Sequence, residues 1–181
     1  MLHINFTPFP SITTQRLTLR RLNIKDAKEI MMLRSDERVN EFIDRPKSID
    51  LNEAKNFMEK IDKGINNNEW IYWAITLKDD DTLIGTICLW NISVENDMAE
   101  LGYELQPDFQ GKGLMQEAVT KIIEYGFNKM RLKVITAFTH PNNNRSTSLL
   151  LKHNFLLDKN YKYVEGEDAG ELSVYYLINH L

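Results

Sequence analysis

Apolar and polar positions follow two different periods along this chain. Amphipathic runs at residues 24–33 and 51–65 predict two helices, and the alternating stretch 15–22 before them predicts a strand. Asp50 stands directly before the second run as its expected N-cap. From residue 70 the apolar period becomes two, which predicts an antiparallel meander of strands at 70–77, 83–92 and 98–105.

The second half of the chain opens on the most regular helical pattern. Residues 113–130 carry apolar side chains three and four positions apart, and this predicts a long helix that packs on the meander. A strand, a short helix and two closing strands follow, expected at 133–138, 144–153, 155–163 and 171–178. An order with about seven strands and about four helices indicates an α+β fold with a mixed sheet, not a doubly wound parallel one.

Composition favours one compact domain over residues 1–181. Hydrophobic residues make up 43% and charged residues 27%, close to globular averages, which excludes a disordered or fibrous protein. The net charge of −4 argues against a nucleic-acid partner. The single cysteine, Cys88, can form no internal disulfide, which fits the cytoplasm. No membrane partner is expected, because no run approaches the length of a bilayer-spanning helix.

A glycine-rich turn joins the strand at 98–105 to the long helix. It reads Gln110-Gly111-Lys112-Gly113-Leu114-Met115. Two glycines separated by one residue allow a sharp turn whose N–H groups meet an anion at the helix N-terminus. Ordinary strand-to-helix turns also use glycine, so the pair alone is weak evidence for a pyrophosphate site. The turn lacks both the Walker Lys-Ser/Thr pair and the third glycine of the dinucleotide fingerprint.

This turn resembles the coenzyme A motif of the GNAT acetyltransferases, Gln/Arg-x-x-Gly-x-Gly/Ala, with Gln110 and Gly113 at its first two fixed positions. Met115 replaces the small third residue, as in the RimJ/RimL branch that acetylates ribosomal-protein N-termini. Asn143 and Ser146 match the family's Asn-x-x-Ser helix start. The resemblance covers roughly residues 16–178, and its element order is the one expected above.

The resemblance implies an acetyl-CoA-dependent N-acetyltransferase without a metal, in which a primary amine attacks the thioester directly in a ternary complex. The acceptor is a protein N-terminus or a small-molecule amine. An α-amine, with a pKa of about 8, needs less help from a base than a lysine near about 10.4. The residues that would hold the coenzyme are Leu105, Gln110, Gly111, Lys112, Gly113, Leu114, Met115, Asn143 and Ser146.

Two strand carboxylates and one serine are the catalytic candidates. Glu100 and Glu104 lie four residues apart, so strict alternation puts both on one face. The resemblance implies that Glu100 relays the amine proton through water, and Glu104 is the second candidate for this base. The alternative for each is a solvated strand carboxylate without a catalytic role. The family's acidic tyrosine is replaced by Leu150. Ser146 is then the candidate hydrogen-bond donor to the departing sulfur, unless it only completes the start of its helix.

Other readings stay open at this point. The missing tyrosine is also compatible with an acetyl-CoA-binding module that has lost catalysis, and the glycine turn with a protein that binds another nucleotide. The acidic stretch 165–171 either attracts a cationic acceptor or is a solvated hairpin. Trp70, Trp73 and Trp90 are expected in the core, and Cys88 as a buried small hydrophobe. The choice between a monomer and a homodimer is not decided by the sequence.

Overall fold

The computed structural model describes residues 1–43, 45, 50–160 and 172–179. In these ranges the chain forms an eight-stranded sheet and five α-helices. The strands are β1 (Ile12–Thr13), β2 (Leu17–Arg20), β3 (Ile71–Leu77), β4 (Asp80–Ser93), β5 (Met98–Leu105), β6 (Val134–Thr139), β7 (Leu156–Leu157) and β8 (Ser173–Ile178). The helices are α1 (Ala27–Ser35), α2 (Glu37–Asn40), α3 (Leu51–Asn66), α4 (Leu114–Tyr125) and α5 (Asn144–Lys152).

The sheet has the strand order β1-β2-β3-β4-β5-β6-β8-β7. Every neighbouring pair is antiparallel except β5 and β6, which run parallel because α4 carries the chain back between them. The expected mixed α+β sheet and the β3–β4–β5 meander are therefore confirmed.

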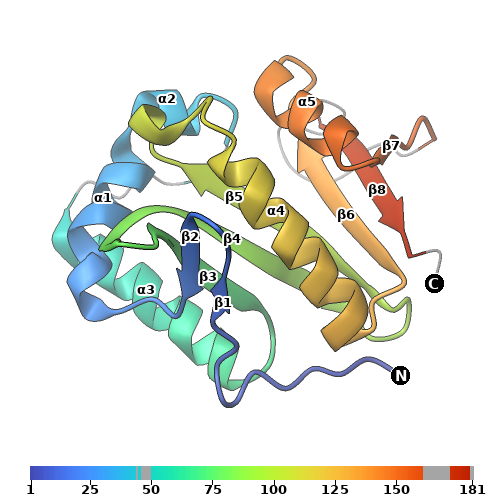
Figure 1. The fold of residues 1–181 in the computed structure, drawn as a ribbon, viewed down its shortest axis with the longest axis horizontal. Coiled ribbons are helices and arrows are strands. Elements are labelled where there is room, and N and C mark those ends of the chain that lie inside the picture. The colour runs from blue at the N-terminus through green and yellow to red at the C-terminus, as the bar shows by residue number, and fades with distance from the viewer. Residues whose placement is uncertain (44, 46–49, 161–171, 180–181) are drawn as a thin grey trace.

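Helices cover both faces of the sheet (Figure 1). Adjacent residues of β3 show how alternation divides the packing: Trp73 meets Tyr125 of α4 with ring centroids 5.3 Å apart, whereas Tyr72 meets Phe57 of α3 at 6.0 Å. Thus α4 packs on one face, and α3, with α1 beside it, packs on the other.

The long helices begin where their sequences predict. The Asp50 side chain accepts hydrogen bonds from the backbone N–H groups of Asn52 and Glu53, so it caps α3 as expected. The pattern over 113–130 divides into α4 and a following π-helical turn, Gly126–Met130. Of the first helical run, residues Ile24–Asp26 form a 3₁₀ turn ahead of α1. Among the described helices, none has the length and apolar character needed to cross a bilayer.

Several small features differ from the sequence prediction. The helix α2 and the strand β1 were not expected, because four and two residues are too short to show a period. Of the strand expected at 155–163, only Leu156–Leu157 is a strand within the part described up to residue 160. The core prediction is wrong for Trp90, which is 41% exposed, and right for Trp73, which is fully buried. The acidic stretch 165–171 lies outside the described residues.

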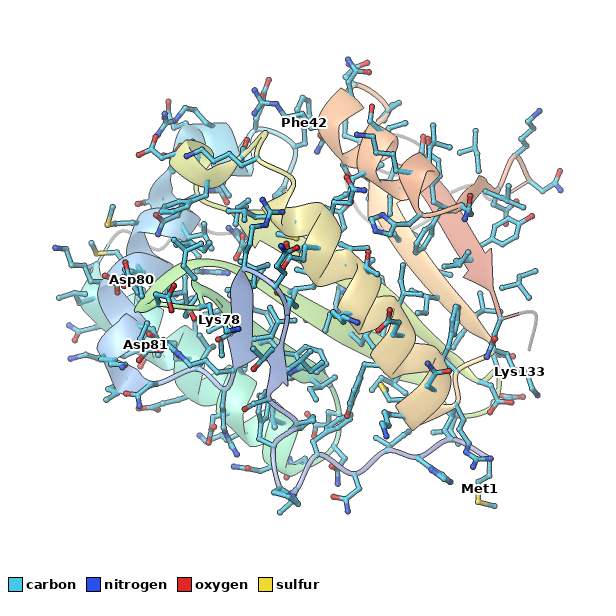
Figure 2. All side chains as sticks on the ribbon, in the orientation of Figure 1. Met1, Phe42, Lys78, Asp80, Asp81 and Lys133 are labelled. Carbon is cyan, nitrogen blue, oxygen red and sulfur yellow. The ribbon has the colours of Figure 1, made fainter. Side chains whose placement is uncertain are left out.

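A contact near the open ends of β5 and β6 joins two distant segments. Phe42, which follows α2, stacks on His140, which follows β6, with ring centroids 5.3 Å apart. Figure 2 labels Phe42 near α5, far from α3. The chain between α1 and α3 therefore reaches across to the α5 side of the molecule.

Candidate active site

The parallel ladder between β5 and β6 is short and ends inside both strands. Its register pairs Met98 with Val134, Ala99 with Ile135, and Glu100 with Thr136. Both strands continue, to Leu105 and Thr139, and Figure 1 shows them diverging toward α2 and α5. On its other edge β5 stays paired with β4 as far as Leu105. The sheet is thus open on the β6 side beyond Glu100.

Glu100 and Glu104 lie on the same face of β5. The β4–β5 register runs without interruption from Gly85–Leu105 to Trp90–Glu100, so the alternation of side chains is preserved between the two carboxylates. The irregularity lies in β4 instead, between Trp90 and Ser93. Ala99 and Leu101 point the other way, into the core that includes α4.

Glu100 lines a cavity of about 440 Å³ on the sheet face opposite α4. Apolar side chains from three strands make most of its wall, with a hydroxyl, an amide and a second carboxylate among them. The lining residues are Asn91, Met98, Glu100, Val134, Thr136, Phe138, Asp158, Val174 and Tyr176.

Two neighbours on β4 hold the Glu100 carboxylate. Asn91 Nδ2 donates to Glu100 Oε2 over 2.9 Å, and the side chain of Trp90 forms a second hydrogen bond to it. Asn91 has φ of 47°, in the left-handed region that asparagine tolerates better than most residues, and this conformation belongs to the irregular stretch of β4. The bulge therefore brings the Asn91 amide to the carboxylate.

Burial raises the pKa of Glu100 to about 7, and the hydrogen bonds from Asn91 and Trp90 oppose that shift. A carboxyl group with such a pKa exists in both protonation states near neutral pH. It can therefore accept a proton from a substrate and release it again.

Glu104 has a different environment. Its Oε2 lies 2.6 Å from Nη2 of Arg45, and the two side chains are only 6% and 17% exposed. Thr86 Oγ1 donates to Glu104 Oε1 over 3.2 Å and accepts from the Tyr72 hydroxyl over 2.8 Å. Glu104 thus belongs to a buried chain of hydrogen-bonded polar side chains and forms an ion pair with Arg45. It does not line the cavity beside Glu100.

The glycine turn has the backbone that its sequence predicts. Gly111 and Gly113 both have φ of 73°, and Gly113 is the N-cap of α4. A side chain in this conformation costs about 1–2 kcal/mol. A Cβ at Gly111 would meet nothing within 4 Å, so the backbone, not packing, requires glycine there. Because glycine cannot cap α4 with a side chain, the first N–H groups of the helix are available to an anion.

Residues from distant segments surround this turn. Arg16 Nη1 donates to the carbonyl of Lys112 over 2.9 Å, and Arg16 Nε donates to Glu117 Oε2 of α4 over 2.7 Å. Arg145 Nη1 donates to Gln110 Oε1 over 2.6 Å, while Gln110 Nε2 donates to the carbonyl of Leu105 over 2.8 Å.

Three cationic side chains therefore gather at one helix N-terminus of a chain with a net charge of −4. Sequence reasoning identified Lys112 and missed both arginines. Arg145 lies inside the Asn143–Ser146 motif and could have been found there. For Arg16 no local signal exists, since it stands almost a hundred residues before the turn. Leu114 and Met115 begin α4 and pack against the core, so what they offer an anion is their backbone N–H groups.

Ser146 lies in the first turn of α5. The Asn143 side chain accepts from the Ser146 backbone N–H over 3.1 Å and so caps the helix. The Ser146 hydroxyl is 2.8 Å from that of Tyr103 on β5, a residue that sequence reasoning missed. Leu150, at the position of the family's tyrosine, is fully buried in the core. The hydroxyl of Ser146 is therefore not used to cap its own helix.

Comparison with known proteins gives a consistent result. Residues 16–155 match the family model described as the acetyltransferase (GNAT) domain. An uncharacterised N-acetyltransferase of Bacillus licheniformis, p20, is 34% identical over 140 residues, which is 77% of this chain and 79% of the relative.

Solved structures share the fold. A candidate ribosomal-protein-serine acetyltransferase from Vibrio cholerae superposes with a TM-score of 0.82 at 23% identity, covering 95% of this chain and 99% of the other. The RimL ribosomal-protein α-N-acetyltransferase in complex with coenzyme A gives a TM-score of 0.82 at 17% identity, covering 93% and 98%. At these identities the likeness concerns the architecture.

Proposed function

Since this chain belongs to the GNAT family of acetyl-CoA-dependent acetyltransferases, we propose that its acceptor is the α-amine of a protein or peptide N-terminus. The acetyl group then passes directly from acetyl-CoA to that amine within a ternary complex. Two curated relatives from Escherichia coli that are named for ribosomal-protein acetylation, at 29% identity over 86 residues and 32% over 100 residues, support a protein acceptor. The single cysteine, Cys88, can form no internal disulfide and supports a cytoplasmic location as part of the same proposal.

The glycine turn is the proposed site of the coenzyme pyrophosphate. Two left-handed glycines leave the N-terminus of α4 open, and Arg16, Lys112 and Arg145 supply positive charge around it. Among the described residues, no group of three or more His, Cys, Asp or Glu side chains could hold a metal ion, and the proposed route uses none.

One observation carries the choice of acceptor: Glu100, with a pKa of about 7, lines the cavity at the point where the β5–β6 ladder ends. Moving a proton from an α-amine of pKa about 8 to this carboxylate is unfavourable by about 1.4 kcal/mol. The same transfer from a lysine of pKa about 10.4 is unfavourable by about 4.6 kcal/mol. The lysine transfer costs about 3.2 kcal/mol more because of the amines themselves, and of the two only the α-amine lies within about one pKa unit of this carboxylate.

The proposed chemistry follows from this placement. Glu100 takes the amine proton through a water molecule, the amine nitrogen bonds to the acetyl carbon, and the carbon–sulfur bond breaks. Coenzyme A leaves as a thiolate, and the amide stays on the acceptor. Glu104 is not needed as a base, because its carboxylate is already the partner of Arg45 and Thr86.

A catalytically inactive acetyl-CoA-binding module is the second candidate, and Leu150 in place of the family's tyrosine favours it. The two candidates differ in turnover. The purified chain is given acetyl-CoA and peptides whose only amine is the N-terminus, with the same peptides carrying a blocked N-terminus and one lysine as the matched set. We expect thiol release with the first set and at most about a hundredth of that rate with the second. Coenzyme binding without thiol release would establish the inactive module.

A further inference from the structure

Tyr103 and Ser146 connect β5 to α5 on the face opposite Glu100. Their hydroxyl oxygens are 2.8 Å apart. Tyr103 follows Glu100 by three residues in an uninterrupted register, so the two side chains point to opposite faces of the sheet. Glu100 forms the last pair with β6, and Tyr103 stands beyond it, in the part of β5 that β6 no longer accompanies. A base and a pair of hydroxyls therefore lie on the two sides of the same opening.

Resting on the function proposed above, we propose that Tyr103 is a positioning residue for Ser146. Its phenol donates a hydrogen bond to Ser146 Oγ, which directs the single hydroxyl proton of Ser146 toward the sulfur of the departing coenzyme A. Tyr103 thus supplies a hydroxyl beside Ser146 from β5. The position of the family's tyrosine on α5 is Leu150, which has no polar group.

The direction of the hydrogen bond follows from the surroundings of the pair. Burial raises the pKa of Tyr103 to about 12, so its phenol keeps its proton throughout the working pH range. A phenol buried in this way needs an acceptor, and Ser146 Oγ is the one within reach among the described side chains. The cap of α5 does not require the Ser146 hydroxyl, since Asn143 Oδ1 accepts from the Ser146 backbone N–H. That proton is left for a ligand.

The chemistry needs only a hydrogen bond. When the amine nitrogen has bonded to the acetyl carbon, the electron pair of the broken carbon–sulfur bond stays on sulfur. A thiol of pKa about 8.5 is a far stronger acid than a phenol of pKa about 12, so the proton stays on the tyrosine. The Ser146 hydroxyl stabilises the thiolate, which takes its proton from water after release. The amine proton leaves on the other face, through Glu100.

The test removes the phenol oxygen and keeps the ring. We expect Tyr103→Phe to lower kcat with an N-terminal peptide about threefold to tenfold and to leave the KM for acetyl-CoA within about twofold. Ser146→Ala should lower kcat about tenfold to a hundredfold, and the double variant should be no slower than Ser146→Ala alone. Tyr125→Phe is the matched control, because it removes another phenol from the same core, one that packs on Trp73. It should keep the wild-type kcat.

Each outcome decides the inference. A folded Tyr103→Phe protein with wild-type kcat would overturn it, and so would a double variant whose loss equals the product of the two single losses. Should Tyr103→Phe not fold, Ser146→Ala decides alone, since an unchanged kcat there removes the serine from the reaction. A wild-type protein that binds acetyl-CoA and acetylates no amine overturns the proposed function, and this inference with it. An active wild type with an unaffected Tyr103→Phe variant overturns this inference only.

Discussion

Glu100 and Thr136 form the last residue pair of the parallel β5–β6 ladder, and both side chains line the same cavity. Backbone pairing thus fixes where the carboxylate stands relative to the opening of the sheet. A slip of one residue in the register of β5 would turn Glu100 into the core that includes α4. The position of the proposed base is therefore a property of the sheet and not of a loop.

Replacing Glu100 by glutamine should remove the base and the part of the acid limb of the pH profile near pH 7, and leave the part near about 8 that belongs to the substrate α-amine. The carboxylate must be deprotonated to act, so wild-type kcat/KM should rise with pH through about 7. We expect Glu100→Gln to reduce kcat/KM about a hundredfold at pH 7.5, and less below pH 6, where the wild-type base is itself protonated. Kinetics over pH 5.5–9 measure this. Glu59→Gln, on the exposed side of α3, is the control, and a limb near pH 7 that survives in Glu100→Gln would assign it to another group.

The same substitution has a consequence for stability. Because folding raises the pKa of Glu100, the folded state binds the proton more tightly, and stability falls as pH rises from the unfolded pKa near about 4.5 to about 7. Glu100→Gln removes the buried charge, so we expect a higher Tm than wild type at pH 8 and an equal Tm at pH 4. Thermal unfolding at the two pH values checks this without any substrate. Equal Tm values at pH 8 would mean that the carboxylate is not desolvated.

Asn91 should tune the base through its hydrogen bond. Its amide favours the charged carboxylate, so its removal should raise the pKa of Glu100 and move the acid limb to higher pH. Asn91→Gly is the suitable change, because glycine keeps the left-handed backbone at φ 47°. We expect a shift of the limb with little loss of maximal kcat. Asn91→Ala should show the same shift with about 1 kcal/mol of lost stability, owing to the strained backbone. A limb that does not move in either variant would mean that this hydrogen bond leaves the base unchanged.

The cations around the glycine turn should dominate coenzyme affinity. We expect Arg16→Gln and Arg145→Gln each to weaken binding of coenzyme A about threefold to tenfold, and to reduce its dependence on salt, since both side chains are partly exposed. Lys55→Gln, an exposed change on α3, should have no effect. Calorimetric titration at two salt concentrations is the measurement. Unchanged affinity in both arginine variants would move the pyrophosphate elsewhere.

Glu104→Gln should affect stability more than chemistry. It leaves the Arg45 guanidinium nearly buried beside a neutral partner, and a broken buried pair costs about 3–5 kcal/mol. Since glutamine still accepts from Thr86, we expect a loss below that range or at its lower limit, about 2–3 kcal/mol, measured by urea unfolding. The acid limb near pH 7 should persist. Its disappearance would make Glu104, not Glu100, the base.

Local patterns predicted the elements that have enough length to show a period. Asp50 and the run after it predicted α3 with its cap, and strict alternation correctly placed Glu100 and Glu104 on one face of β5. The glycines of the turn were identified because a turn with left-handed backbone favours glycine, and the positive φ values of Gly111 and Gly113 agree.

The parts that could not be predicted depend on contacts between distant segments. Arg16, directly before β2, reaches the turn from the far end of the sequence, and Tyr103 meets Ser146 because α5, which packs on β6, also comes within reach of β5. Trp90 alternates like a core residue, yet it stands where the register of β4 becomes irregular and is exposed beside Glu100. Such relations have no signature in a single sequence.

The short β5–β6 ladder has a mechanical consequence. Only three residue pairs join the half of the sheet that carries β6 and β8 to the half that carries β1 to β5, against six pairs between β6 and β8. A ligand bound between β5 and α5 would contact both halves of the sheet and so connect them. Binding of the acetyl donor should then slow amide hydrogen exchange in β6 well beyond the residues that contact the ligand. The donor would thus also fix the two halves of the sheet relative to each other.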